Sequence, residues 1–312
     1  MRARESERPF PDPNPERSRP VVPPPEPTAG HWAGAPSACL ADGKIHLAYR
    51  LRRPVGEGRG YAVVIARATD DGERFETLGT VHKDRLDTES LERPALVRTE
   101  EGRWRLYVSC ATPGTKHWRV EVLEADSPER LAGASADVVL PGSAGVGVKD
   151  PVILRHGGKW HLWASCHPLE EWDEADRMVT DYATSADGLD WTWHGTVLRG
   201  RPGLWDARGA RVTTVVPHQG HIFAYYDGRA SAAENYEERT GLALGTGIGG
   251  VLLAQGDAPI AESAHHGSGL RYLCAVPLPG GYGWRLYYEA TRADGAHELR
   301  TEVHRGSRPR VR

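Results

Sequence analysis

One two-strand unit recurs five times along this chain, and the repeat restricts the fold more than any other feature. Each copy has an extended segment, a turn that contains glycine, and a second segment rich in β-branched and aromatic residues. The clearest copy runs from Val148 to Leu154, turns at Gly157-Gly158 and continues from Lys159 to Cys166. The copies recur about every 56–63 residues when they are aligned on Leu47, Leu106, Leu162, Phe223 and Leu286.

The spacing of the repeat predicts a β-propeller, because it matches the length of one blade. Outer hairpins with their own turns, such as Asp187-Gly188 and Asp294-Gly295, follow the two-strand units. We therefore predict an all-β fold, a single five-bladed β-propeller with four-stranded antiparallel blades, over residues 29–312. Residues 1–28 are rich in Pro, Arg and Glu, a composition that predicts a disordered tail.

Composition excludes several classes of function. The net charge is −3 and the arginines are scattered, which argues against nucleic acid or an anionic membrane as a partner. We find no signal-peptide core and no apolar run of membrane-spanning length, so we expect a cytoplasmic protein. None of the four cysteines forms a CxxC pair, and His265-His266 would point in opposite directions in an extended chain. We expect no metal and no other cofactor.

Three carboxylates near the starts of the predicted inner strands are the candidate catalytic groups. The first strand of each blade lines the central channel of a propeller, so function is expected where these strands begin. Asp150 opens an otherwise apolar strand, Glu92 holds the equivalent place in the second blade, and Asp206 precedes the fourth. A turn-capping Asp150 and a local Glu92–Arg93 surface pair are the structural alternatives.

The candidate binding residues surround these carboxylates in the sequence. Guanidinium groups near the channel suit carboxylate, phosphate or sugar-hydroxyl recognition, although a salt-bridge ladder between blades would use the same residues. The polar stretch 225–241 is long for a hairpin turn and is a candidate loop at the channel mouth. The predicted substrate-binding set is Trp32, Arg93, Lys149, Trp205, Arg208, Arg211, Asp227, Arg229 and Glu238.

The five-fold repeat, Asp150-Pro151 on an inner strand and the outer hairpin Ser185-Ala186-Asp187-Gly188-Leu189-Asp190-Trp191 together resemble the five-bladed propeller glycosidases. These are glycoside hydrolase families 43, 32, 68 and 130, and the resemblance covers residues 30–304. The segment from Asp42-Gly43-Lys44 to Tyr49-Arg50 is similar to a family 130 pattern. In family 43 an Asp-Pro of blade one supplies the base, an Asp-Pro of blade three tunes acidity, and a Glu of blade four is the acid.

The chain matches this pattern only at Asp150-Pro151. Ala35 stands where the resemblance implies the base, and Arg211 lies in the segment where it implies the acid. The resemblance implies a carbohydrate-active enzyme that acts on a glycosidic bond in the axial funnel, with a small-molecule carbohydrate as ligand. The two missing acids imply an alternative, a non-catalytic or repurposed propeller that binds a sugar or another small metabolite.

Overall fold

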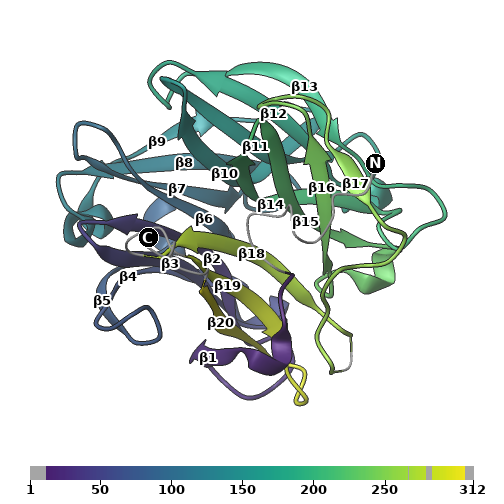
Figure 1. Ribbon diagram of the computed structural model, residues 1–312, viewed down its shortest axis with the longest axis horizontal. Helices are drawn as coiled ribbons and strands as arrows, with labels where there is room; N and C mark the ends of the chain where they lie inside the picture. The colour runs from purple at the N-terminus through teal and green to yellow at the C-terminus, as the bar shows by residue number, and fades with distance from the viewer. Residues whose placement is uncertain (1–11, 266, 279–282, 306–312) are drawn as a thin grey trace, which may run out of the picture.

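Antiparallel sheets arranged in a ring form the fold (Figure 1). The computed structural model describes residues 12–265, 267–278 and 283–305; His266 and the turn residues Gly281 and Tyr282 lie outside them. The first strands of neighbouring sheets contact each other around the axis. The predicted all-β, five-bladed propeller with four-stranded blades is therefore confirmed.

The blades follow one another along the chain, and each is numbered here from its innermost strand. Blade one contains β2 (Trp32–Ala41), β3 (Lys44–Arg52), β4 (Gly60–Ala68) and β5 (Phe75–His82). Blade two contains β6 (Leu91–Arg98), β7 (Trp104–Ala111), β8 (Trp118–Ala125) and β9 (Ala136–Leu140). Blade three contains β10 (Val146–His156), β11 (Lys159–Pro168), β12 (Val179–Ser185) and β13 (Thr192–Leu198).

Blade four contains β14 (Gly209–His218), β15 (His221–Arg229), β16 (Arg239–Gly245) and the short β17 (Leu253–Gln255). Blade five contains β18 (Leu270–Pro277), β19 (Gly283–Thr291) and β20 (His297–Arg305). The remaining elements are 3₁₀ turns, which are η2 (Pro15–Arg17), η3 (Val55–Glu57), η4 (Lys83–Leu86), η5 (Pro128–Gly133), η6 (Trp172–Glu174) and η7 (Ala232–Glu234). In the described part of the chain, no helix has both the length and the apolar character needed to cross a membrane.

The N-terminal segment supplies the outer strand of blade five. Strand β1 (Arg19–Val22) pairs antiparallel with β20, so that Arg19 lies opposite Thr301. The structure differs here from the expectation of a disordered tail over residues 1–28. Arg300 explains the difference, because its guanidinium donates to the hydroxyl and carbonyl oxygens of Ser18 at 2.6 and 2.9 Å. Residues 1–11 lie outside the described part.

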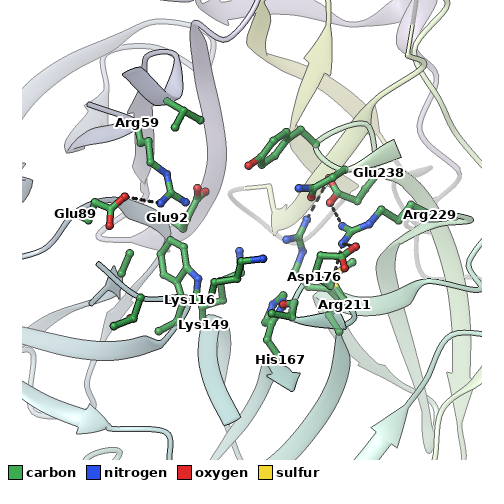
Figure 2. Close-up of a pocket in the computed structure, with 18 of the residues that line it drawn as sticks. Arg59, Glu89, Glu92, Lys116, Lys149, His167, Asp176, Arg211, Arg229 and Glu238 are labelled. Carbon is green, nitrogen blue, oxygen red and sulfur yellow. Dashed lines mark hydrogen bonds and ion pairs between the residues drawn. The ribbon is translucent and has the colours of Figure 1, made fainter. Parts of the chain in front are cut away.

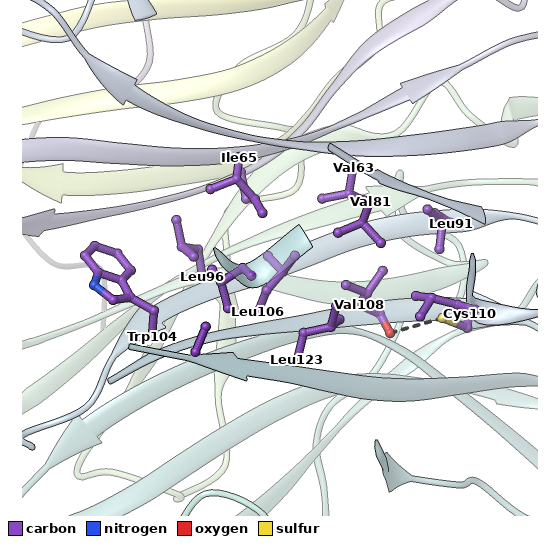
Figure 3. Close-up of a cluster of buried hydrophobic side chains, with 14 of the residues drawn as sticks. Val63, Ile65, Val81, Leu91, Leu96, Trp104, Leu106, Val108, Cys110 and Leu123 are labelled. Atoms are coloured by element: carbon purple, nitrogen blue, oxygen red, sulfur yellow. Dashed lines mark hydrogen bonds between the residues drawn. The ribbon is translucent and has the colours of Figure 1, made fainter. Parts of the chain in front are cut away.

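The hydrophobic core is divided among the interfaces between blades. The described residues contain five buried apolar clusters, and each joins two neighbouring blades. Between blades one and two, Val63 and Ile65 face Leu96, Leu106 and Leu123 (Figure 3). Because strands alternate their side chains between two faces, each blade can take part in two such clusters.

A bulge interrupts every inner strand near its start. The register with the second strand shifts at residues 34–37, 91–94, 149–152, 212–214 and 271–274. Ala35, Asp150 and Tyr272 adopt positive φ angles of 51°, 54° and 56° at these bulges. Such a bulge kinks the strand and redirects its side chains, and here it does so beside the axis.

Candidate functional site

A cavity of about 490 Å³ opens at the end of the axis where the inner strands begin (Figure 2). Inner strands contribute Glu92, Lys149, Arg211, Arg271 and Tyr272 to its wall. Most of the other lining residues lie at the ends of second strands or in the loops between second and third strands. All five blades therefore contribute to one cavity, which we call the front cavity. Its wall carries charges of both signs.

Glu92 is held between two arginines. It is 4% exposed, accepts a 2.9 Å hydrogen bond from Arg52 and pairs with Arg50. Arg50 also donates to Glu289 at 2.8 Å. A Cβ added to Gly34 would lie 2.1 Å from the Glu289 carboxylate, so glycine at this position makes room for that side chain. Burial opposes the charge of Glu92, but the two arginines outweigh it and lower its pKa to about 2.

The same ion-pair chain continues around the axis to blade four. Arg271 bridges Glu289 and Glu238 at 2.7 Å each. Glu238 also pairs with Arg229, which donates to Asp176 at 3.2 Å on the rim. Burial opposes the charge of Glu238, but Arg271, Arg211 and Arg229 together outweigh it and lower the pKa of this carboxyl. Glu92 and Glu238 are therefore ionised at neutral pH and cannot donate a proton.

Asp150 lies directly behind the cavity wall. It is fully buried, and its amide donates a 2.8 Å hydrogen bond to the Ser109 hydroxyl. One carboxylate oxygen accepts from Arg211 at 2.9 Å and lies 3.7 Å from the Lys149 ammonium. The other carboxylate oxygen has no hydrogen-bond partner among the described residues. Asp150 is thus neutralised by Arg211 and is positioned away from the cavity surface.

Arg211 occupies the centre of the polar network. Besides Asp150 it donates to Asp227 at 2.7 Å and to the Tyr272 hydroxyl at 3.1 Å. Its guanidinium also lies over the Tyr272 ring, 4.0 Å from the centroid. Burial raises the pKa of Asp227 to about 6, whereas Arg211 and the Tyr272 amide favour its ionised form. A guanidinium therefore fills the blade-four position at which the family resemblance implies a general acid.

Two lysines line the front cavity, and neither has, among the described residues, a carboxylate at the short distance found for the arginines of this wall. Lys149 lies 4.7 Å from the centre of the Trp118 ring and is 13% exposed. Lys116 lies 4.3 Å from the centre of the Trp172 ring and donates to the Trp172 carbonyl. Trp172 itself is 63% exposed at the cavity rim. An exposed aromatic ring can stack on a sugar ring, and the ammonium groups of the same cavity can bind an acidic substituent.

His167 lines the cavity as a neutral group. Burial, followed by the charges of Lys149 and Arg229, lowers its pKa well below the usual value. We assign its Nδ1–H as the donor to the Ala175 carbonyl at 3.1 Å, which leaves Nε2 to accept from the Ser165 hydroxyl at 3.1 Å. In the described residues, no three His, Cys, Asp or Glu side chains converge as a metal site would require.

The structure brings several predicted site residues to the cavity. Those that line it are Glu92, Lys149, Arg211, Arg229 and Glu238. Asp150 and Asp227 lie behind them, each fully buried and paired with Arg211.

The other predicted site residues lie elsewhere. Asp206 is fully buried and accepts hydrogen bonds from Arg201 and the Tyr226 hydroxyl, and Trp205 stacks on Tyr226. Trp32 is buried against His297, with the Arg52 and Arg271 guanidiniums over its ring. Arg208 pairs with Asp176 and Glu174. Arg93 lines a separate channel. None of these five is part of the front-cavity wall.

Several residues of the network are not among those predicted from the sequence. Arg50 and Glu289 are charged residues inside second strands whose other residues are mostly apolar, and this contrast was a usable signal. Lys116 and Trp172 gave no such signal, because they meet across loops of two different blades.

Comparison by sequence finds no relative. No protein-family model and no curated protein matches the chain.

Comparison by structure finds many propellers of carbohydrate-active enzymes. A thermostable family-43 glycoside hydrolase aligns with a TM-score of 0.67 at 14% identity, over 88% of this chain and 89% of the other. A family-43 enzyme from Xanthomonas citri, solved with xylotriose, gives 0.62 at 16% identity over 92% and 89%. A structure from family 130, whose members include mannoside phosphorylases and hydrolases of β-1,2 mannosidic linkages in Candida mannan, gives 0.63 at 17% over 88% and 86%. This chain therefore has the five-bladed propeller fold of the family-43 and family-130 glycosidases and phosphorylases.

Proposed function

We propose that this protein binds a carbohydrate in the front cavity. The cavity volume lies within the usual range for small-molecule sites. Trp172 offers an exposed ring at the rim, and the charged wall offers hydrogen-bond donors and acceptors for hydroxyl groups. Similar propellers act on carbohydrates, and one of them was solved with xylotriose bound.

The position of Arg211 is the observation that favours binding over hydrolysis. Glycoside hydrolysis generally needs two carboxyl groups that flank the bond, and one of them must be protonated to act as the acid. Arg211 forms ion pairs with Asp150 and Asp227. The arginines that neighbour Glu92 and Glu238 lower the pKa values of these two carboxyls. This wall favours recognition of a ligand rather than proton transfer to it.

The two lysines favour a carbohydrate with an acidic substituent. Lys116 has no carboxylate ion pair among the described residues, and the nearest acid to Lys149 is at 3.7 Å. A carboxylate or phosphate on the ligand would give both ammonium groups a close anionic partner. We therefore expect an acidic oligosaccharide to bind more tightly than its neutral counterpart.

Cleavage of a glycosidic bond is the second candidate. Glu92 lies across the cavity from Glu238 and Asp176 (Figure 2), which leaves carboxylates on opposite walls. In this candidate, either water or a phosphate held by the arginines would attack the bond. Of the three predicted catalytic residues, Glu92 alone lines the cavity.

A ligand panel tests both candidates. Neutral and acidic oligosaccharides are screened for thermal stabilisation and by calorimetry, and aryl glycosides are assayed for turnover with and without phosphate. We expect stabilisation without turnover, and about tenfold weaker binding after Trp172→Ala through lost stacking. Trp193→Ala is the matched control, since Trp193 is exposed on β13 and does not line this cavity.

Each result decides between the candidates. Turnover by the unaltered protein would replace the binding proposal by the enzymatic one. Neither stabilisation nor turnover with any carbohydrate would overturn both. Equal effects of the two tryptophan changes would remove Trp172 from the site.

A further inference from the structure

A second cavity, which we call the axial channel, opens along the later part of the same five inner strands. Its volume is about 340 Å³. Each inner strand contributes apolar wall, represented by Ala38, Ala95, Val152, Val215 and Ala275. The front cavity shares none of these residues, so the axial channel is a separate space at the other end of the strands.

Arg93 lines the axial channel and forms no ion pair with a carboxylate of the described residues, although Asp150 and Asp227 act on its charge from a longer distance. It is 3% exposed, and its guanidinium donates to the carbonyls of Pro36 at 3.3 Å and Thr213 at 2.6 Å. Its third nitrogen, Nη1, is buried and has no hydrogen-bond partner in the described part of the chain. Burial lowers the pKa of Arg93, in contrast to the carboxylate-paired Arg50 and Arg271, whose pKa values are raised.

The rest of the described lining contributes no carboxylate, since it contains no Asp or Glu. Arg98 and Arg155 line the channel as well, and each pairs with an exposed carboxylate outside the lining, Asp42 and Glu100 respectively. Two thiols, Cys39 and Cys274, also line it, but burial raises the pKa of both, to about 12 for Cys39. The thiols are therefore neutral and do not balance Arg93.

We infer that the axial channel is a binding site for a small organic monoanion, with a carboxylate placed on Arg93 and an apolar body against the five strands. A buried guanidinium without a counterion is costly, and a carboxylate is its best geometric partner. Apolar walls favour an apolar body over a bare inorganic ion. The site does not depend on the function proposed for the front cavity.

Hexanoate and its neutral isostere hexanamide test the inference. Binding of each to the full-length protein is measured by calorimetry and by thermal shift at constant chloride concentration. We expect hexanoate to bind at least about tenfold more tightly than hexanamide, because the pairing with Arg93 is charge-assisted. Arg93→Met should abolish this preference, whereas Arg103→Met, a change of an exposed arginine of the same blade, should preserve it.

A labelling experiment on the unaltered protein keeps the test independent of any variant. Cys39 is partly exposed and lines the channel, so a bound ligand should slow its modification by methyl methanethiosulfonate. We expect protection by hexanoate and none by hexanamide or chloride at the same concentration. Equal binding of the acid and the amide, an unchanged preference in Arg93→Met, or no protection of Cys39 would each overturn the inference, as would a chloride effect equal to that of hexanoate.

Discussion

At the scale of single residues, the balance of buried charge around the axis determines both stability and chemistry. Glu92, Glu238 and Glu289 alternate with Arg50, Arg271 and Arg229, so most buried charges have two opposite neighbours. Removal of one member leaves its partners charged in a medium that solvates them poorly.

Replacement of Glu92 should be strongly destabilising. Glu92→Gln leaves Arg50 and Arg52 without a shared carboxylate, and we expect a loss of about 3–5 kcal/mol in the free energy of unfolding. Glu89→Gln is the matched control, because Glu89 lines the same cavity but is 39% exposed and pairs with Arg59, so its loss should be about 1 kcal/mol or less. Urea unfolding measures both. Equal losses would contradict the role given to the buried network.

Acid should destabilise the protein through the same carboxylates. The pKa of Glu92 is about 2 in the folded state, against an ordinary value of 4.5. Its contribution is therefore complete above pH 4.5 and is lost as the pH falls toward 2, with a size on the order of 3 kcal/mol. Glu238 acts in the same direction. Urea midpoints between pH 7 and pH 3 should fall, and they should fall less in Glu92→Gln than in the unaltered protein.

The sequence indicated some of these residues and concealed others. Asp150, Glu92 and Arg211 could be found because each is a charge at the start of an inner strand. The same rule also selected Asp206, which packs against Arg201 and Tyr226 instead. Which charges face the cavity depends on the bulges and on contacts between blades, and neither is visible in strand periodicity.

At the scale of elements, β1 is the clearest departure from the sequence-based expectation. A segment rich in Pro and Arg has too few apolar residues to fold alone, which is why its composition indicated disorder. It becomes ordered because β20 offers an open edge, and because Arg300 and Glu302 contact Ser18 and Asn14. An edge strand of this kind depends on a partner that local sequence does not reveal.

Truncation measures the contribution of β1. Removal of residues 1–22 should lower the melting temperature more than removal of residues 1–11, because only the larger truncation deletes β1 and exposes the edge of β20. We expect a difference of several degrees, in line with the loss of a few hydrogen bonds and some apolar contact. Melting temperatures that agree for both truncations would show that β1 contributes nothing to blade five.

At the scale of the whole molecule, the five-fold repeat predicted the architecture correctly. Five units with two apolar faces each can bury both faces of every unit only if the last unit packs against the first. The five inter-blade clusters show this arrangement, and a parallel bridge between Trp32 and His297 joins blades one and five. The repeat could not predict how the ring closes, because closure uses β1 rather than a copy of the repeated unit.

Because every blade shares its core with two others, unfolding should be a single cooperative transition. Leu106→Ala, which empties a fully buried site between blades one and two, should cost about 2–5 kcal/mol and shift this one transition to lower temperature. Differential scanning calorimetry distinguishes the outcomes. A second, separate transition would mean that blades melt independently.

The pairing of β1 with β20 also has a consequence for biosynthesis. Arg19 lies opposite Thr301, so β1 is translated long before the strand with which it pairs. Until β20 leaves the ribosome, β1 lacks the strand with which it pairs, and blade five lacks two of its four strands. The earlier blades, made in order, can dock as they emerge, but blade five stays incomplete until β20 has been made. Premature termination before residue 297 would therefore leave both edges of the gap exposed to other chains.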